Sequence, residues 1–165
     1  TMYFSAQNSQ HPNNNQDIIM DKIKYLLILA AILLPLTLSA QTGLAVNRVF
    51  LAHVIPQKQM IEVKVKGRAL SKYHLSFYHS VRFTATAQQK ATIDALVATD
   101  RRYATGTEDR NKGHKTSTIL TLPQRGKTNR FLCYITNRKG KLILTTLAYM
   151  EGSVANIDEL RKLIE

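Results

Sequence analysis

The chain has 165 residues and a formal net charge of +12, because 23 Lys and Arg outnumber 11 Asp and Glu. Its single cysteine excludes an internal disulfide, so the stability of the fold has to come from packing. The positive charge favours an anionic partner such as nucleic acid, acidic polysaccharide or phosphate-bearing lipid, without specifying a fold.

Residues 1–19 have the composition of a segment without a core. They are rich in Asn and Gln and show almost no apolar periodicity. We interpret them as the product of a start codon assigned too early, with translation beginning at Met20. A disordered extension of the protein is the alternative interpretation.

Residues 20–40 have the three parts of a secretory signal peptide. Two lysines form a positive n-region, residues 25–36 form an apolar h-region, and small residues precede the expected cleavage point. We therefore predict export to the periplasm or the outside of the cell, with cleavage after Ala40. The alternative is an uncleaved anchor, although a spanning helix needs about 20 mostly apolar residues.

Residues 41–165 have the length of a single domain. Residues 44–55 are compatible with a short amphipathic helix, which Pro56 would end. Residues 60–66 then alternate between apolar and charged side chains, which predicts a strand with one solvated face.

A second alternating run covers residues 73–83 and follows Gly67, which we expect in a bulge or turn. The next four residues, Thr86-Ala87-Gln88-Gln89, have capping-box spacing and predict the start of a helix. Residues 104–115 are polar and contain two glycines, so we predict a loop there.

Three further strands are predicted at residues 116–122, 130–136 and 141–150, separated by short segments rich in turn formers. Both faces of the middle run are apolar, so we place it centrally, with Cys133 buried beneath a helix. Finally, Ser153 can cap a helix whose apolar stripe is Ile157, Leu160, Leu163 and Ile164.

The predicted order αββαβββα indicates an α+β protein. We expect a two-layer sandwich, with about five mainly antiparallel strands, helices packed on one face and a polar face opposite. In its Ser-Ala-Gln junction, its strand Met-Ile-Glu-Val-Lys-Val-Lys-Gly and its size, the chain resembles small exported domains of unknown function from Gram-negative bacteria. This resemblance implies the periplasm or the outside of the cell and no inherited activity.

Catalytic and metal-binding motifs fail on their spacing. Gly126-Lys127-Thr128 matches the end of a phosphate loop, but the glycine required five residues earlier is absent. His74 and His79 would point to opposite faces of a strand, and we expect His79 to be a core histidine. A buried Cys133 would be unreactive. We therefore predict no metal, no cofactor and no catalytic residues, which favours a non-catalytic protein without excluding an enzyme.

The basic residues of the first two strands form the candidate binding site. If these strands are adjacent and antiparallel, we expect one basic patch on the polar face. Its residues are Lys64, Lys66, His74, Tyr78 and Arg82. The alternative is an ordinary solvated face whose lysines prevent strand edges from pairing with other chains.

We therefore predict an exported, non-catalytic binding or structural module of the bacterial envelope. Its expected partner is an anionic polysaccharide, a lipid headgroup or an envelope protein, reached through the basic patch. Two alternatives are a nucleic-acid-binding protein, against which predicted export argues, and an enzyme or enzyme inhibitor whose site is not visible in the sequence.

Overall fold

The computed structural model describes residues 41–164, the last four by their backbone alone. Its central element is a six-stranded antiparallel sheet. Its strands are β1 (Ile61–Lys66), β2 (Leu75–Ala85), β3 (Gly106–Lys112), β4 (Lys115–Arg125), β5 (Thr128–Lys139) and β6 (Leu142–Gly152). The helices are α2 (Asn47–Phe50), α3 (Ala87–Arg101) and α4 (Ile157–Ile164), with two 3₁₀ helices, η1 (Gln57–Gln59) and η2 (Gly67–Tyr73). None of the described helices is both long and apolar enough to cross a membrane.

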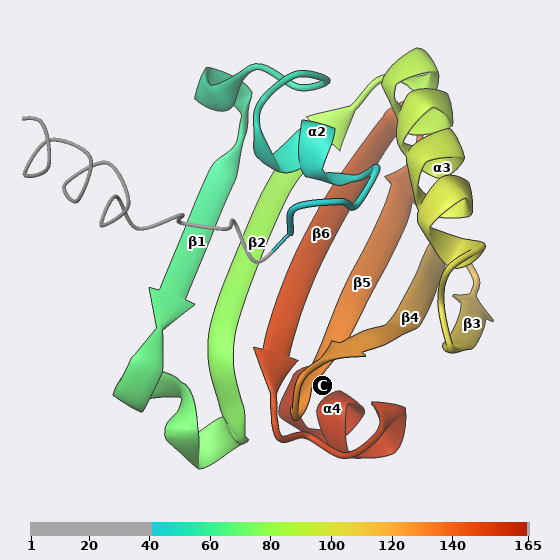
Figure 1. The fold of residues 1–165 in the computed structure, drawn as a ribbon. Coiled ribbons are helices and arrows are strands. Elements are labelled where there is room, and N and C mark those ends of the chain that lie inside the picture. Colours follow the sequence, from blue (N-terminus) through green and yellow to red (C-terminus); the bar gives the residue numbers. More distant parts are fainter. Residues whose placement is uncertain (1–40, 165) are drawn as a thin grey trace, which may run out of the picture. The chain divides into compact units, whose positions relative to one another are not determined.

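The strands lie in the order β1-β2-β6-β5-β4-β3, and each pairs with its neighbours in the antiparallel direction (Figure 1). The last four strands form a meander, whereas β2 pairs with β6 at the far end of the sequence. The predicted α+β class with an antiparallel sheet is therefore confirmed. The sheet has six strands rather than five, and the α-helices and strands follow the order αββαββββα.

The additional strand is β3, in the segment 104–115 where the sequence predicts a loop. It pairs with β4 around Gly113, whose φ of +56° suits the tight turn of a hairpin. Arg101, at the end of α3, donates two hydrogen bonds of 2.8 Å to the Asp109 carboxylate of β3. The loop prediction is wrong because β3 is an edge strand, and its polar side chains give no apolar alternation.

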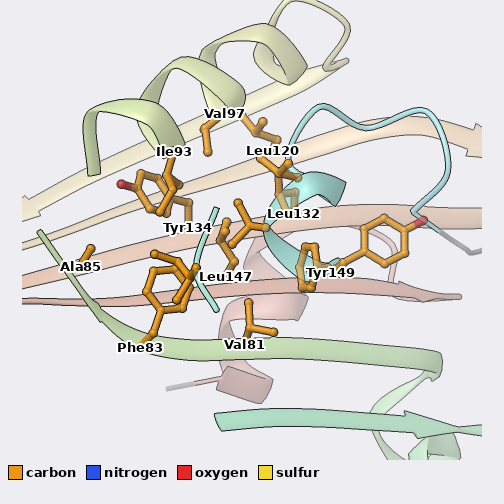
Figure 2. Close-up of a cluster of buried hydrophobic side chains, with 14 of the residues drawn as sticks. Val81, Phe83, Ala85, Ile93, Val97, Leu120, Leu132, Tyr134, Leu147 and Tyr149 are labelled. Atoms are coloured by element: carbon orange, nitrogen blue, oxygen red, sulfur yellow. The ribbon is translucent and has the colours of Figure 1, made fainter. Parts of the chain in front are cut away.

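One face of the sheet, here called the α3 face, packs against α2 and α3. Figure 2 shows Ile93 and Val97 of α3 above side chains from β2, β4, β5 and β6. The labelled sheet residues of this cluster are Val81, Phe83, Ala85, Leu120, Leu132, Tyr134, Leu147 and Tyr149. This face therefore carries the larger of the two buried clusters.

The opposite face, here called the α4 face, has a second core. Leu160 of α4 and Leu70 of η2 pack there with Phe131, Cys133 and Met150 from the sheet. The expected arrangement, with every helix on one face and a polar face opposite, is therefore wrong. The predicted burial of Cys133 is confirmed at 3% exposure, since its strand has apolar residues on both faces.

The helix ends show how local chemistry places these layers. Thr86 and Gln89 form the predicted capping box at the start of α3. The start of α4 is capped by Asn156, whose Oδ1 accepts the Glu159 backbone N–H at 2.9 Å, rather than by Ser153. Of the helix predicted over residues 44–55, the α-helical part is only the four residues of α2.

Candidate functional site

The five residues of the expected basic patch do not share one face. Directly paired residues of an antiparallel ladder point to the same side of the sheet. Lys64 pairs with His79, and Lys66 pairs with Phe77, so both lysines lie on the α3 face. The Lys66 Nζ atom lies over the Phe77 ring, 5.4 Å from its centre, in a cation–π contact.

The other three residues lie elsewhere. Tyr78 and Arg82 alternate with the residues of β2 that point to the α3 face, so both belong to the α4 face. Tyr78 is half-buried against the second core, whereas Arg82 is exposed. His74 lies at the end of η2, outside both strands. The two strands are adjacent and antiparallel, as the prediction required, but the prediction assigned side chains from opposite faces to one patch.

His74 instead belongs to a cavity of about 320 Å³ at one end of the sheet, here called the polar pocket. Three parts of the chain meet there: the end of η2 with the start of β2, the β4–β5 turn and the end of β6. Its lining residues are Ser71, His74, Leu75, Ser76, Lys127, Thr128, Gly152 and Ser153. The pocket thus joins a residue of the expected patch to the Gly126-Lys127-Thr128 segment.

A close backbone approach holds this pocket together. The Ser153 backbone N–H donates to the His74 carbonyl oxygen at 2.9 Å. A Cβ atom at Gly152 would lie 2.2 Å from that oxygen, so only glycine fits between β6 and η2. The sequence signal for this contact is a glycine at the end of a strand, which marks close approach of a second backbone.

Two residues with positive φ shape the walls of the pocket. His74 has φ +57° and ψ +26°, a left-handed conformation that is uncommon for a non-glycine residue and that ends η2. Gly126 has φ +62° in the β4–β5 turn, and the next two residues reach the pocket. At both positions the left-handed backbone turns the chain, so that His74 and the two residues after Gly126 line the same cavity.

The chemistry of the lining is cationic and rich in hydroxyls. Lys127 supplies a positive charge and His74 an imidazole, while none of the described lining residues is acidic. Three of the four hydroxyls donate to backbone carbonyl oxygens, which leaves their own oxygens as acceptors; they belong to Ser71, Ser76 and Ser153. The pocket therefore suits a ligand that combines a negative group with hydroxyl donors.

A second basic hollow lies on the β3–β4 hairpin. It measures about 60 Å³, and its lining residues are Arg110, Lys112, Lys115 and Ser117. The Arg110 Nε atom donates to the Glu108 carboxylate at 2.8 Å, so part of its charge is neutralised. This hollow is smaller than the polar pocket and lies beside an acidic side chain.

A histidine and a carboxylate also meet at His79 and Glu62, which resembles an acid–base pair. The His79 Nε2 atom lies 2.6 Å from Glu62, and Nδ1 lies 2.7 Å from the Gln41 side-chain amide. This fits a neutral ring that donates to Glu62 and accepts from Gln41. Burial lowers the pKa of His79, and the hydrogen bonds from Gln57 and His79 lower the pKa of Glu62.

The environment of His79 argues for a structural role. The residue is 3% exposed, and its ring packs at a tilt against the Phe50 ring, with 4.7 Å between the ring centres. A substrate cannot reach a ring that is enclosed in this way, so the prediction of a core histidine is confirmed. Gln41, for which the sequence predicts no role in the core, is 2% exposed, and its side-chain amide contacts the His79 ring.

The remaining thiol is also unsuited to chemistry. Cys133 is buried, and this burial raises its pKa to about 11, so that the thiolate is scarce at neutral pH. Within residues 41–164, no three side chains of His, Cys, Asp or Glu are grouped so that they could hold a metal ion. The polar pocket is therefore the strongest candidate site in the described part of the chain.

Comparison with known proteins gives a family without a known activity. The profile of the family of unknown function DUF6108 matches residues 33–164, which is most of the chain. No curated protein and no solved structure matches the sequence significantly. On the extent of the family match, the chain belongs to the family of unknown function DUF6108.

Proposed function

We propose that this protein is an exported, non-catalytic binding module of the bacterial envelope, and that its polar pocket binds an acidic polysaccharide. The observation that carries the proposal is the combination of Lys127 and His74 with hydroxyl oxygens in a cavity whose described lining residues include no acid. A sugar hydroxyl can donate to the serine oxygens, while a carboxylate or sulfate group pairs with Lys127.

The charge of the whole chain supports an anionic partner. Residues 1–40 contain two basic and two acidic residues, so the excess of +12 lies entirely in residues 41–165. Such a field attracts polyanions over distances of about one Debye length, about 8 Å at physiological salt. The pocket then supplies the local contacts that distinguish a site from general attraction.

Export is supported by the sequence of residues 20–40, with its basic start, apolar centre and small residues before Gln41. An exported protein meets envelope polysaccharides rather than the bulk of cellular nucleic acid. This favours the polysaccharide over nucleic acid as the partner, although both carry the negative charge that the field attracts.

The test compares two lysines in equivalent settings. Lys127 and Lys141 each follow a glycine in a hairpin turn, but only Lys127 lines the polar pocket. On immobilised heparin, Lys127→Gln is expected to elute at clearly lower salt than Lys141→Gln, with about tenfold weaker binding, because it loses a charged hydrogen bond. His74→Gln is expected to weaken binding at unchanged charge.

Equal shifts for the two lysine variants would show that only the diffuse charge matters, and the polar pocket would then be rejected as the site. Retention of the wild-type protein on double-stranded DNA that exceeds its retention on heparin, at equal salt, would favour the nucleic-acid alternative instead.

A further inference from the structure

Strand β1 forms one edge of the sheet, and among residues 41–164 it pairs only with β2 (Figure 1). An edge strand presents backbone N–H and C=O groups that can pair with another chain. On the α4 face β1 also exposes apolar side chains, with Ile61 69% and Val63 45% exposed. This edge therefore combines free backbone groups with an apolar stripe.

We propose that β1 pairs antiparallel with β1 of a second copy of this chain, so that two sheets continue into one across a two-fold axis at Val63. In this register Val63 lies opposite Val63 of the second copy, and Ile61 lies opposite Val65. On the other face Glu62 lies opposite Lys64. The strand is thus complementary to itself on both faces, as an isologous interface requires.

The neighbouring registers lack this complementarity. A two-fold axis normal to the sheet passes between two identical residues, so a shift of one residue places Glu62 opposite Glu62, or Lys64 opposite Lys64. Like charges directly opposite each other destabilise a strand pair. A shift of two residues toward the end of the strand places Lys64 opposite Lys66. The sequence of β1 therefore favours the register at Val63.

Glu62 can accept a hydrogen bond from Lys64 of the second copy in addition to its existing contacts. Its two oxygens already accept from His79 and Gln57, at 2.6 and 2.7 Å. A carboxylate has about four acceptor sites, so two stay available for Lys64. Lys64 of each copy, which would otherwise discourage edge pairing, then meets an opposite charge.

The other edge of the sheet does not have this property. Strand β3 has the sequence Gly-Thr-Glu-Asp-Arg-Asn-Lys, with charged residues on both faces. Pairing centred on Asp109 would place two carboxylates opposite each other, and pairing centred on Arg110 would do the same with two guanidinium groups. β3 is therefore less suited to pairing with itself than β1 is, and pairing through β1 would not involve the polar pocket.

The first test measures mass by light scattering on protein purified from cells that express the full sequence. We expect a dimer for the wild type and a monomer for Val63→Lys, because two lysines would then face each other at the axis. Leu142→Lys is the matched control, since Leu142 is 62% exposed at the start of β6, away from β1. It is expected to remain a dimer.

The second test fixes the register through cross-linking by oxidised glutathione. Paired residues across an antiparallel ladder have Cβ atoms about 5 Å apart, so Val63→Cys is expected to form a covalent dimer. In the same register, two cysteines at position 61 would lie about 13 Å apart along the strands, beyond the reach of a disulfide. Ile61→Cys is therefore expected to form no disulfide, and to run as a monomer without a cross-linked band on a non-reducing denaturing gel.

Three results would overturn the proposal. The first is a monomeric wild type at every concentration tested. The second is a dimer that persists unchanged in Val63→Lys. The third is cross-linking of Ile61→Cys as fast as that of Val63→Cys, which would indicate another register or random collisions.

Discussion

Asp100 is a buried carboxylate that connects α3 to the segment before α2. It is 3% exposed, and its two oxygens accept the backbone N–H groups of Ala45 and Val46 at 2.7 and 2.9 Å. Burial raises the pKa of Asp100, while these two hydrogen bonds act in the opposite direction. Asp100 thus accepts hydrogen bonds from backbone N–H groups just before α2, where the N-cap residue supplies no side-chain cap.

Replacement of Asp100 should therefore be costly. We expect Asp100→Ala to lower the free energy of unfolding by about 2 to 3 kcal/mol, because two buried backbone donors lose a charged acceptor. Urea unfolding followed by circular dichroism measures this loss. Asp109→Ala, which removes a carboxylate from an exposed pair with Arg101, should cost less than about 1 kcal/mol. Equal costs would contradict the structural role of Asp100.

His79 should make the fold sensitive to mild acid. Burial lowers its pKa in the folded state, whereas in the unfolded chain it titrates near the ordinary value of about 6.5. As the pH falls through that value, the unfolded chain binds a proton that the folded protein does not, so the unfolded state is favoured. The contribution of the neutral His79 ring to the stability of the fold is thus fully present above a pH of about 6.5 and is lost progressively below it.

The expected loss is at most about 1.4 kcal/mol per pH unit, the value for one proton. Thermal unfolding at several pH values between 7.5 and 5.5 measures it. His79→Gln should flatten this dependence, whereas the exposed His114→Gln should leave it intact. An unchanged slope in His79→Gln would assign the acid sensitivity to other groups.

At the level of single residues, the sequence predicted the buried His79 and Cys133 because each lies on an apolar side of a strand. Asp100 was not predicted, although a signal exists. It follows Ile93 and Val97 at helical spacing, so an acidic side chain falls on the buried stripe of α3. An acid in that position needs partners that are distant in sequence, and a single sequence does not identify them.

Among the elements, strands with an apolar face were predicted, and β3 was not. Apolar alternation is a weak guide on an edge strand, and this also explains why Lys64 and Lys66 of β1 were assigned to the wrong face. Alternation shows that Lys64 and Val63 point to opposite faces, but on an edge strand both faces are partly exposed. The ladder register with β2, which places Glu62 opposite Val81 and within hydrogen-bond reach of the buried His79, decides which face meets the larger core. Hence the charged side of β1 lies on the α3 face, and the apolar side, with the exposed Ile61 and Val63, lies on the α4 face.

Gly152 tests the close approach of β6 and η2. In Gly152→Ala the new Cβ would lie 2.2 Å from the His74 carbonyl oxygen, a backbone atom that cannot move alone. We expect a loss of about 1 to 3 kcal/mol in unfolding free energy, together with weaker heparin binding as the polar pocket distorts. In the control, Gly106→Ala, the nearest atom is a Thr121 side-chain oxygen at 3.4 Å, so little loss is expected. Similar losses in both variants would argue against a special contact at Gly152.

For the whole molecule, the predicted cleavage after Ala40 sets the start of the mature chain. Gln41 follows the expected cleavage site, and its side-chain amide is buried against His79. We expect intact-mass analysis of the periplasmic fraction to find a chain that begins at Gln41. A mature protein that retains residues 25–36 would instead support an uncleaved anchor.

The pairing of β2 with β6 also has a consequence for the timing of folding. Ala85 pairs with Ile143, and Leu75 pairs with Gly152, so β1 and β2 can join the other four strands only after β6 has been synthesised. Contacts between such distant segments form slowly, since a long loop must close before they contribute. During synthesis β1 and β2 thus cannot pair with the rest of the sheet until β6 has left the ribosome. If the protein is exported as we propose, its unfinished sheet would leave the chain open for passage through a channel that admits only unfolded polypeptide.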